Sequence, residues 1–232
     1  MSVFEAAIGW LAQPLCVGCG GEGASLCAEC SPAKILPFGE RCAFCGTVSK
    51  ASRSCQNCRR GGVPSHVWVT TNHAGLARDL LHNYKFGQQR AAADSIAHLM
   101  TTTLNQLHPD VRGLTSHKYL VVPVPTATKR VRERGFDHSA LLAKKIANQL
   151  KLDYRPALGR LGQTRQVGSK RADRLTQMDG KFWVKRPAAV RGWQILLTDD
   201  VITTGATLRA AAKVLRQAGA LRVNALIFAK RL

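Results

Sequence analysis

The chain has 232 residues, of which 45% are hydrophobic, and it carries a formal net charge of +20. This apolar content supports a sizeable core, in one large domain or in a main domain with a small appendage. No window approaches the roughly 18–20 unbroken apolar residues that a membrane-spanning helix needs. Residues 1–65 hold six Lys or Arg against four acidic residues, so nearly all of the positive charge belongs to the rest of the chain. Such an excess attracts polyanions, nucleic acid being the usual candidate, although a basic surface that serves a small phosphorylated ligand would look the same.

The first residues predict a short amphipathic helix. Phe4, Ile8 and Leu11 follow a helical spacing, and Pro14 ends the pattern. The acidic Glu5 and the lack of a basic leading region argue against a signal peptide. We expect this helix to pack on the protein's own core, with a membrane-surface anchor as the alternative, and we expect a cytoplasmic protein.

All eight cysteines fall within residues 16–58, where they form four Cys-x-x-Cys pairs. Each pair directs two thiolates toward one point, and two pairs complete a tetrahedron around zinc. A disulfide framework or a redox pair fits less well, because there is no secretory signal and four such pairs crowd one short segment. Since large apolar residues are few here, the metal must supply much of the folding free energy. We expect two structural zinc ions, most simply on Cys16, Cys19, Cys27 and Cys30 and on Cys42, Cys45, Cys55 and Cys58, with an interleaved grouping left open.

After the breaker Gly61–Pro64 the pattern changes to alternating strands and helices, so we divide the chain into residues 1–64 and 65–232. The first part comprises the N-terminal helix and a double zinc ribbon. The alternation in the second part predicts an α/β fold, in which a parallel sheet is flanked by helices and ligands bind at the carboxyl ends of the strands. Strands are expected over His66–Thr71, Tyr119–Val124, Gln194–Thr198 and Val223–Ala229, with a short extended piece near Phe182–Val184. Helices are expected over Gly75–Tyr84, Arg90–Leu107, Ser139–Leu150 and Thr207–Ala218, and a basic loop over Gly162–Arg174.

The segment Ile195–Leu208, with the sequence ILLTDDVITTGATL, places two adjacent aspartates at the end of a buried strand. Residues 203–207 then form a turn that enters a helix, whose free backbone N–H groups suit a phosphate. Gly205 permits close backbone approach, and the threonines of the turn add hydroxyl donors. Asp199 and Asp200 can accept hydrogen bonds from vicinal sugar hydroxyls, and they favour a positive charge, either Mg²⁺ or a cationic reaction centre. The plainer alternative is an N-capped helix beside solvated acids.

This segment resembles the phosphoribosyl-pyrophosphate (PRPP) signature of type I phosphoribosyltransferases. Together with the cysteine-rich front, the chain more narrowly resembles the ComF family of competence-associated, amidophosphoribosyltransferase-like proteins. The resemblance covers essentially the whole chain, including YKFG (84–87), VVPVP (121–125), RERGFDHS (132–139) and Thr164, Gln166, Arg174 and Phe182. It implies a type I phosphoribosyltransferase-like parallel sheet with a small N-terminal double zinc ribbon.

The resemblance also implies roles for individual residues. Asp199 and Asp200 would hold the ribose hydroxyls of PRPP and stabilise positive charge at the anomeric carbon. The basic loop would close over the reaction and exclude water. The 5′-phosphate would be held by Thr203, Thr204, Gly205, Ala206 and Thr207. The pyrophosphate side, with Mg²⁺ bridging, would be supplied by Lys129, Arg130, Arg134 and Gly135, with Lys85 as a weaker candidate; the arginine run could instead be an ordinary solvated face.

The chain departs from the family pattern at two places. The family commonly has Asn-Gln where this chain has Asp137-His138, and Asn where it has Gln177. These departures leave the phosphate turn untouched and put any carried-over acceptor site in doubt. The seven histidines are scattered without ligand spacing, so none is assigned to metal binding or catalysis.

Two functions of different classes follow. The chain could be a phosphoribosyltransferase, a glycosyltransferase that moves a pentosyl group from PRPP to an unidentified acceptor. It could instead be a non-catalytic module that retains PRPP or a nucleotide, while its basic surface and zinc ribbons contact single-stranded DNA or a protein. The family association implies DNA uptake and natural transformation, with DNA-uptake proteins as partners and a peripheral position at the inner membrane. The intact motif disfavours a third reading, a scaffold that binds no ligand.

Overall fold

The computed structural model describes residues 13–31, 35–87, 89–107, 119–161 and 180–231, so the expected N-terminal helix, the basic loop and Gln177 lie outside the described residues. Five strands form a parallel sheet in the order β1-β7-β6-β2-β3, and β4 pairs with β5 in an antiparallel ribbon. The strands are β1 (Val67–Asn72), β2 (Tyr119–Pro123), β3 (Asp153–Tyr154), β4 (Leu158–Arg160), β5 (Phe182–Val184), β6 (Gln194–Ile202) and β7 (Arg222–Lys230). The helices are α3 (Gln56–Arg60), α4 (Gly75–Phe86), α5 (Ala92–Leu107), α6 (Thr128–Arg134), α7 (His138–Leu150) and α9 (Ala206–Gln217), with short 3-10 turns at Lys50–Ser52 and Pro187–Ala189.

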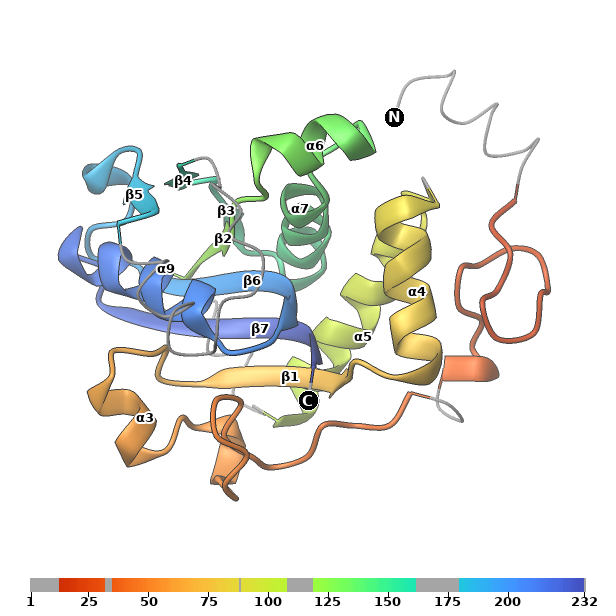
Figure 1. The fold of residues 1–232 in the computed structure, drawn as a ribbon, viewed down its shortest axis with the longest axis horizontal. Helices are drawn as coiled ribbons and strands as arrows, with labels where there is room; N and C mark the ends of the chain where they lie inside the picture. The colour runs from red at the N-terminus through yellow and green to blue at the C-terminus, as the bar shows by residue number, and fades with distance from the viewer. Residues whose placement is uncertain (1–12, 32–34, 88, 108–118, 162–179, 232) are drawn as a thin grey trace, which may run out of the picture.

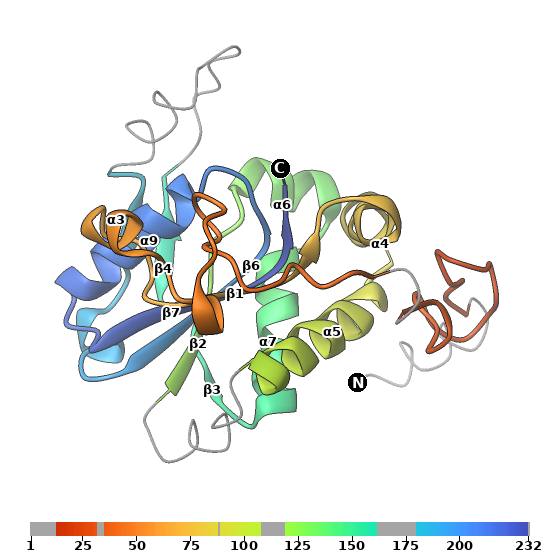
Figure 2. The same cartoon turned by 90° about the horizontal axis from the view of Figure 1, so that it is seen from below.

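Helices cover both faces of the sheet, as Figures 1 and 2 show. Helix α9 packs on one face, and α4, α5 and α7 pack on the other. Successive residues of a strand point to opposite faces, so Ile195 and Leu197 of β6 enter the core beneath α9 while Leu196 enters the other core. Burial on both faces explains why the strands read as continuous apolar runs. The predicted parallel sheet flanked by helices is therefore confirmed.

Strand β6 is longer than the expected Gln194–Thr198. Its neighbour β7 pairs with it in register as far as Ile202 opposite Lys230, so both aspartates stand within the strand rather than beyond it. Helix α6 was not expected, because its sequence TKRVRER is short and mostly charged and shows no apolar spacing. The structure thus places both aspartates within the central strand β6, with the turn following it.

The cysteines form two modules, which we define as the first cysteine module (residues 13–31) and the second cysteine module (residues 35–63). The first module lies beside α4 and adds Cys16, Leu26 and Cys30 to the core beneath that helix. The second module packs on the opposite face, where Ala43 and Phe44 join the core of α9. The division of the chain after residue 64 stays a prediction, while the structure shows each module contributing to one core of the sheet.

Candidate functional site: the carboxyl end of the central strand

The expected phosphate turn connects β6 to α9 near the carboxyl edge of the sheet. Gly205 is the residue before α9 and has φ of 76°, a left-handed conformation that disfavours any side chain. The hydroxyl of Thr204 accepts a hydrogen bond from the N–H of Ala206 at 3.4 Å. The first N–H groups of a helix have no intrahelical partner and carry partial positive charge, and the first turn of α9 contains no acidic residue that would compete for them. The turn can therefore accept an anionic group.

Asp200 is a buried carboxylate held by two basic side chains. Its Oδ2 lies 2.5 Å from Nζ of Lys85, on α4, and 3.1 Å from Nε2 of His138, at the start of α7. Burial alone would raise the pKa of this carboxyl, but Lys85 and His138 outweigh it and hold the pKa well below its usual range. Asp200 is therefore negatively charged at neutral pH.

Asp199 behaves in the opposite way. Its Oδ1 accepts the N–H of Asp200 at 2.9 Å. Burial, and then the negative charge of Asp200, raise the pKa of Asp199 to about 8, with Lys85 and Arg160 opposing the shift. Two neighbouring carboxyls that cannot both ionise share protons as a pair. At neutral pH the pair carries about one negative charge and offers both a donor and acceptors to a vicinal diol.

His138 links Asp200 to Arg134. Arg134 Nη1 lies 2.9 Å from Nδ1 and 3.2 Å from Nε2 of His138, so the guanidinium contacts both ring nitrogens. Nε2 of the same ring lies 3.1 Å from Oδ2 of Asp200. The hydroxyl of Tyr84 donates to the His138 carbonyl at 2.5 Å, which fixes the residue further. His138 thus contacts both Asp200 and Arg134, two residues that the sequence predicts to belong to the site.

The expected pyrophosphate residues divide into two groups. Lys85 and Arg134 belong to the cluster around Asp200, and burial lowers the pKa of Arg134, with Arg130 as the next cause. Lys129 is exposed on α6 and lies 4.0 Å from Glu133. Arg130 is also exposed on α6. The two exposed cations can reach a ligand only from the solvent side.

Three residues next to the aspartate pair have no role in the sequence prediction: His138, Arg160 and Asp137. Arg160 donates to the Pro125 carbonyl at 3.3 Å and is close enough to Asp199 to oppose the rise of its pKa. Asp137 caps α7 by accepting the Ala140 N–H at 3.1 Å. The one sequence signal for this region was the Asp137-His138 departure from the family pattern, which in the structure is a helix cap followed by the Asp200 partner.

The cysteine thiols are gathered in the sequential grouping. Within each set of four, the sulfur atoms lie within 4.8 Å of one another. A tetrahedron with zinc–sulfur bonds of about 2.3 Å has sulfur–sulfur edges of about 3.8 Å. The distances are 3.8 Å between the sulfurs of Cys19 and Cys27 and 3.6 Å between those of Cys45 and Cys55. Both sets therefore fit a structural zinc ion.

The thiols of the first set also shift one another's pKa. Burial raises the pKa of Cys16, but the N–H groups of Cys27 and Gly18, which donate to its sulfur at 3.3 and 3.4 Å, outweigh burial and bring the pKa to about 6. The hydrogen bond with Cys27, together with burial, raises the pKa of Cys30 to about 12. Four adjacent thiolates cannot coexist without a compensating charge, and a divalent ion supplies that charge.

The chain is similar to curated bacterial proteins over most of its length. It is 26% identical to the competence protein ComFC of Bacillus subtilis (strain 168) over 84% of this chain and 79% of that protein. It is 27% identical to the DNA utilization protein YhgH of Escherichia coli (strain K12) over 93% of both chains. It is 26% identical to competence protein F of Haemophilus influenzae over 88% of this chain and 91% of that protein. No protein-family model matches the chain.

Among solved structures, the chain is similar to glutamine PRPP amidotransferase from B. subtilis, with 20% identity, a TM-score of 0.37 and 62% of this chain covered. It is also similar to a structure described as the allosteric regulatory enzyme of purine biosynthesis, with 18% identity, a TM-score of 0.38 and 63% of this chain covered. The matched region spans 30% and 29% of those chains. The chain has a parallel sheet flanked by helices and two four-cysteine groups that could each hold a zinc ion, and its sequence is similar over most of its length to bacterial proteins named for competence and DNA utilization.

Proposed function

We propose that the chain binds PRPP, or another phosphorylated ribose, at the carboxyl end of β6. The observation that carries the proposal is the Asp199–Asp200 pair on the central strand, directly before a left-handed glycine turn that opens helix α9. A sugar diol matches a carboxyl pair that both donates and accepts. A phosphate matches the free N–H groups of the turn.

In this proposal each predicted residue has a place. Asp199 faces the ribose hydroxyls, and Thr203–Thr207 hold the 5′-phosphate. Lys85 already neutralises Asp200, so it orients that carboxylate and lowers the local negative potential that would otherwise repel a pyrophosphate. Mg²⁺ would bridge the pyrophosphate, with Lys129, Arg130 and Arg134 on the same side. The buried cluster of Asp200, Lys85 and His138 thus preorganises the site before ligand arrives.

Transfer chemistry would use the same residues. As the bond from the anomeric carbon to pyrophosphate breaks, positive charge develops at that carbon, and the carboxylate pair stabilises it. The acceptor nucleophile is not identified, because the described residues around the aspartate pair are ion-pair partners and helix caps and do not form a recognisable acceptor pocket. We therefore propose ligand binding as the function of this site, and transfer to an acceptor as the activity to be tested on it.

Calorimetric titration tests the binding proposal. PRPP is titrated into the zinc-loaded protein with and without Mg²⁺, and the variant Asp199→Asn/Asp200→Asn is compared. The matched control is Asp153→Asn, an exposed Asp on β3 that lies far from the motif in sequence. We expect Mg²⁺-dependent binding by the wild type and by the control, and a loss of at least tenfold in the double variant. Wild-type protein that shows no Mg²⁺-dependent heat would overturn the proposal.

A second candidate function, contact with single-stranded DNA, is favoured by Trp183. Its side chain is 43% exposed, and it lies opposite Gly159 in the β4–β5 ribbon. A Cβ on Gly159 would lie closer than 3.0 Å to Cε2, Cζ2 and Nε1 of the indole, with the fusion carbon Cε2 nearest. An atom whose nearest neighbour in an indole is a fusion carbon lies over the face of the ring. One face of Trp183 therefore packs on Gly159, and the exposed area belongs to the rest of the ring.

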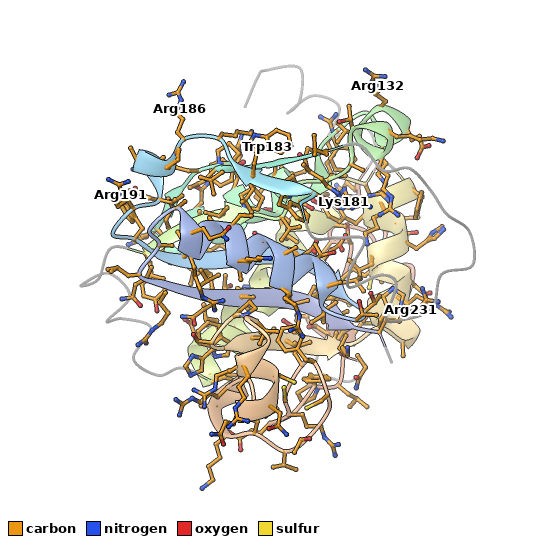
Figure 3. All side chains as sticks on the ribbon, turned by 60° about the vertical axis from the view of Figure 1, so that its left-hand side comes forward. Arg132, Lys181, Trp183, Arg186, Arg191 and Arg231 are labelled. Carbon is orange, nitrogen blue, oxygen red and sulfur yellow. The ribbon has the colours of Figure 1, made fainter. Side chains whose placement is uncertain are left out.

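The surroundings of Trp183 are basic. Residues 180–193 contain four Lys or Arg and no acidic residue. Figure 3 shows Trp183 on β5 with Lys181 and Arg186 toward opposite ends of the strand and Arg191 beyond. An aromatic platform among cations suits the stacked bases and phosphates of a single strand. The names of the competence and DNA-utilization relatives add support for a role in DNA uptake.

Two readouts with oligo-dT test this surface: the anisotropy of a dye-labelled oligonucleotide measures affinity, and intrinsic tryptophan fluorescence measures quenching. We expect tryptophan quenching that is lost in Trp183→Phe while affinity is largely kept, because phenylalanine still stacks. Trp183→Ala should weaken affinity by about 1–3 kcal/mol. Affinity should also fall as salt rises. Equal binding by Trp183→Ala and wild type would remove this surface as the contact.

A further inference from the structure

We propose that Phe44 is a positioning residue for the phosphate turn, so that metal occupancy of the second cysteine module and ligand affinity at the turn are coupled. The ligand side of this inference rests on the proposed function, whereas the coupling of the metal to the turn does not. Phe44 lies between Cys42 and Cys45, two sulfur ligands of the second set. It is therefore held by the same knuckle that would hold the metal.

The contact that carries the inference is between Phe44 and Gly205. A Cβ on Gly205 would lie closer than 3.0 Å to Cδ1 and Cε1 of the Phe44 ring, a distance that real Cβ atoms essentially never show. The ring is 5% exposed and belongs to the same core as Ile202 and Ala206, which flank the turn. Gly205 is thus required twice, once by its positive φ and once by the ring that lies on its α-carbon.

Helix α9 is tied to the same module along its length. Arg209 donates to the carbonyl of Gly61. Arg216 donates from its two terminal nitrogens to the carbonyls of Gly62 at 2.6 Å and Val63 at 2.7 Å. These carbonyls lie three to five residues after Cys58, a ligand of the second set, so both the turn and the helix behind it contact the segment that carries the cysteines.

A cavity of about 790 Å³ separates the rest of the knuckle from the turn. Arg41 and Cys45 line it on the module's side, Thr203 and Thr204 on the turn's side, and Arg231 at the end of the sheet. Phe44 lines the cavity as well, and its ring is the part of the knuckle that reaches Gly205. Loss of this one ring should release the turn into the cavity.

The first cysteine module supplies an internal control. It packs on the opposite face of the sheet, where Gly18 lies against Cys30 and Leu76 at the start of α4. A change in its metal content should affect the core beneath α4. It should leave the conformation of the turn as it is.

Coupling of this kind is reciprocal: if metal in the second module raises affinity for the ligand, ligand must raise affinity for that metal by the same factor. A turn already held in its binding conformation loses less conformational freedom on binding. Coupled sites typically differ by roughly 5–150-fold in affinity. We expect about a tenfold effect here, since one ring makes the contact with Gly205.

The first test uses zinc release to a chromogenic chelator from the full-length, zinc-loaded protein, with and without Mg²⁺ and PRPP. Inorganic pyrophosphate at the same concentration controls for metal binding by phosphate itself. We expect ligand to slow the release of one of two zinc ions about tenfold and to leave the other unchanged. Phe44→Leu should retain two zinc ions, lose this protection and bind PRPP about tenfold more weakly. Equal protection of both ions, or wild-type affinity in Phe44→Leu, would overturn the coupling.

The second test needs no ligand, so its failure is distinguishable from failure of PRPP binding. Amide hydrogen exchange is measured at residues 203–207 in wild type, Phe44→Leu, Cys55→Ser and Cys27→Ser. The two cysteine variants should each lose one zinc ion, from the second and first module respectively. We expect faster exchange of the turn in Phe44→Leu and Cys55→Ser and wild-type exchange in Cys27→Ser. Unchanged exchange in Phe44→Leu, or equal acceleration in both cysteine variants, would show that the second module does not hold the turn.

Discussion

Replacing Asp199 with asparagine should make the protein more stable at alkaline pH while removing ligand binding. The pKa of this carboxyl is raised from an ordinary value of 3.8 to about 8, so the folded chain holds a proton that the unfolded chain releases. A group whose pKa is higher in the folded state contributes stability that declines as pH rises between the two pKa values. Asparagine resembles the protonated carboxyl and cannot ionise.

The magnitude follows from the two pKa values. Each pH unit between them costs the wild type up to about 1.4 kcal/mol, and the loss levels off as pH passes 8. Between pH 6 and pH 8 the wild type should lose about 2 kcal/mol that Asp199→Asn keeps. Other titrating groups, the cysteines included, are present in both proteins, so the difference between them isolates Asp199.

Urea unfolding at pH 6, 7 and 8, without ligand, measures this difference. Asp153→Asn is the control, since Asp153 is exposed on β3 and lies 3.9 Å from its partner Arg155. The stability of wild type and control should fall together with rising pH while that of Asp199→Asn stays flatter. Parallel curves for wild type and Asp199→Asn would refute the shared-proton description of the aspartate pair.

Three further outcomes are expected. Lys85→Met leaves Asp200 charged and buried without its lysine partner, so it should lower the free energy of unfolding in urea by about 3–5 kcal/mol. Lys85→Met/Asp200→Asn should recover part of this loss, and an equal loss in both variants would contradict the ion pair. His138→Ala should cost about 1–3 kcal/mol, whereas His138→Gln, which can still donate to Asp200, should cost less by the same assay. Chelation of zinc should raise hydrogen exchange in the two cysteine modules first, with the paired strands β6 and β7 still protected; simultaneous loss of protection everywhere would show that the metals stabilise the whole fold.

The sequence was sufficient for the fold because its signals are local. Apolar runs such as Ile195–Leu197 mark strands buried on both faces, and the glycine after Thr203 and Thr204 marks the turn. The four Cys-x-x-Cys knuckles could also be predicted, since each is formed within four residues, whereas the choice between a sequential and an interleaved grouping came from the structure. The strand that carries the aspartates proved longer than expected because its length is set by pairing with β7, a partner more than twenty residues away.

The parts that could not be predicted depend on contacts between distant elements. His138 has no ligand-like spacing in the sequence, and it reaches Asp200 only because α7 begins beside the carboxyl end of β6. The opposite placement of the two cysteine modules is likewise invisible in four identical spacings. Gly205 was assigned to ligand approach alone, while the structure shows Phe44 lying on it from a segment 161 positions earlier.

The most direct test of the proposed function is a crystal structure of the protein grown with PRPP and Mg²⁺. We predict a 5′-phosphate hydrogen-bonded to the backbone N–H groups of residues 203–207, a ribose whose hydroxyls contact Asp199, and Phe44 unmoved against Gly205. A ligand bound elsewhere, or a fully occupied ligand that leaves the aspartate pair and the turn untouched, would contradict it.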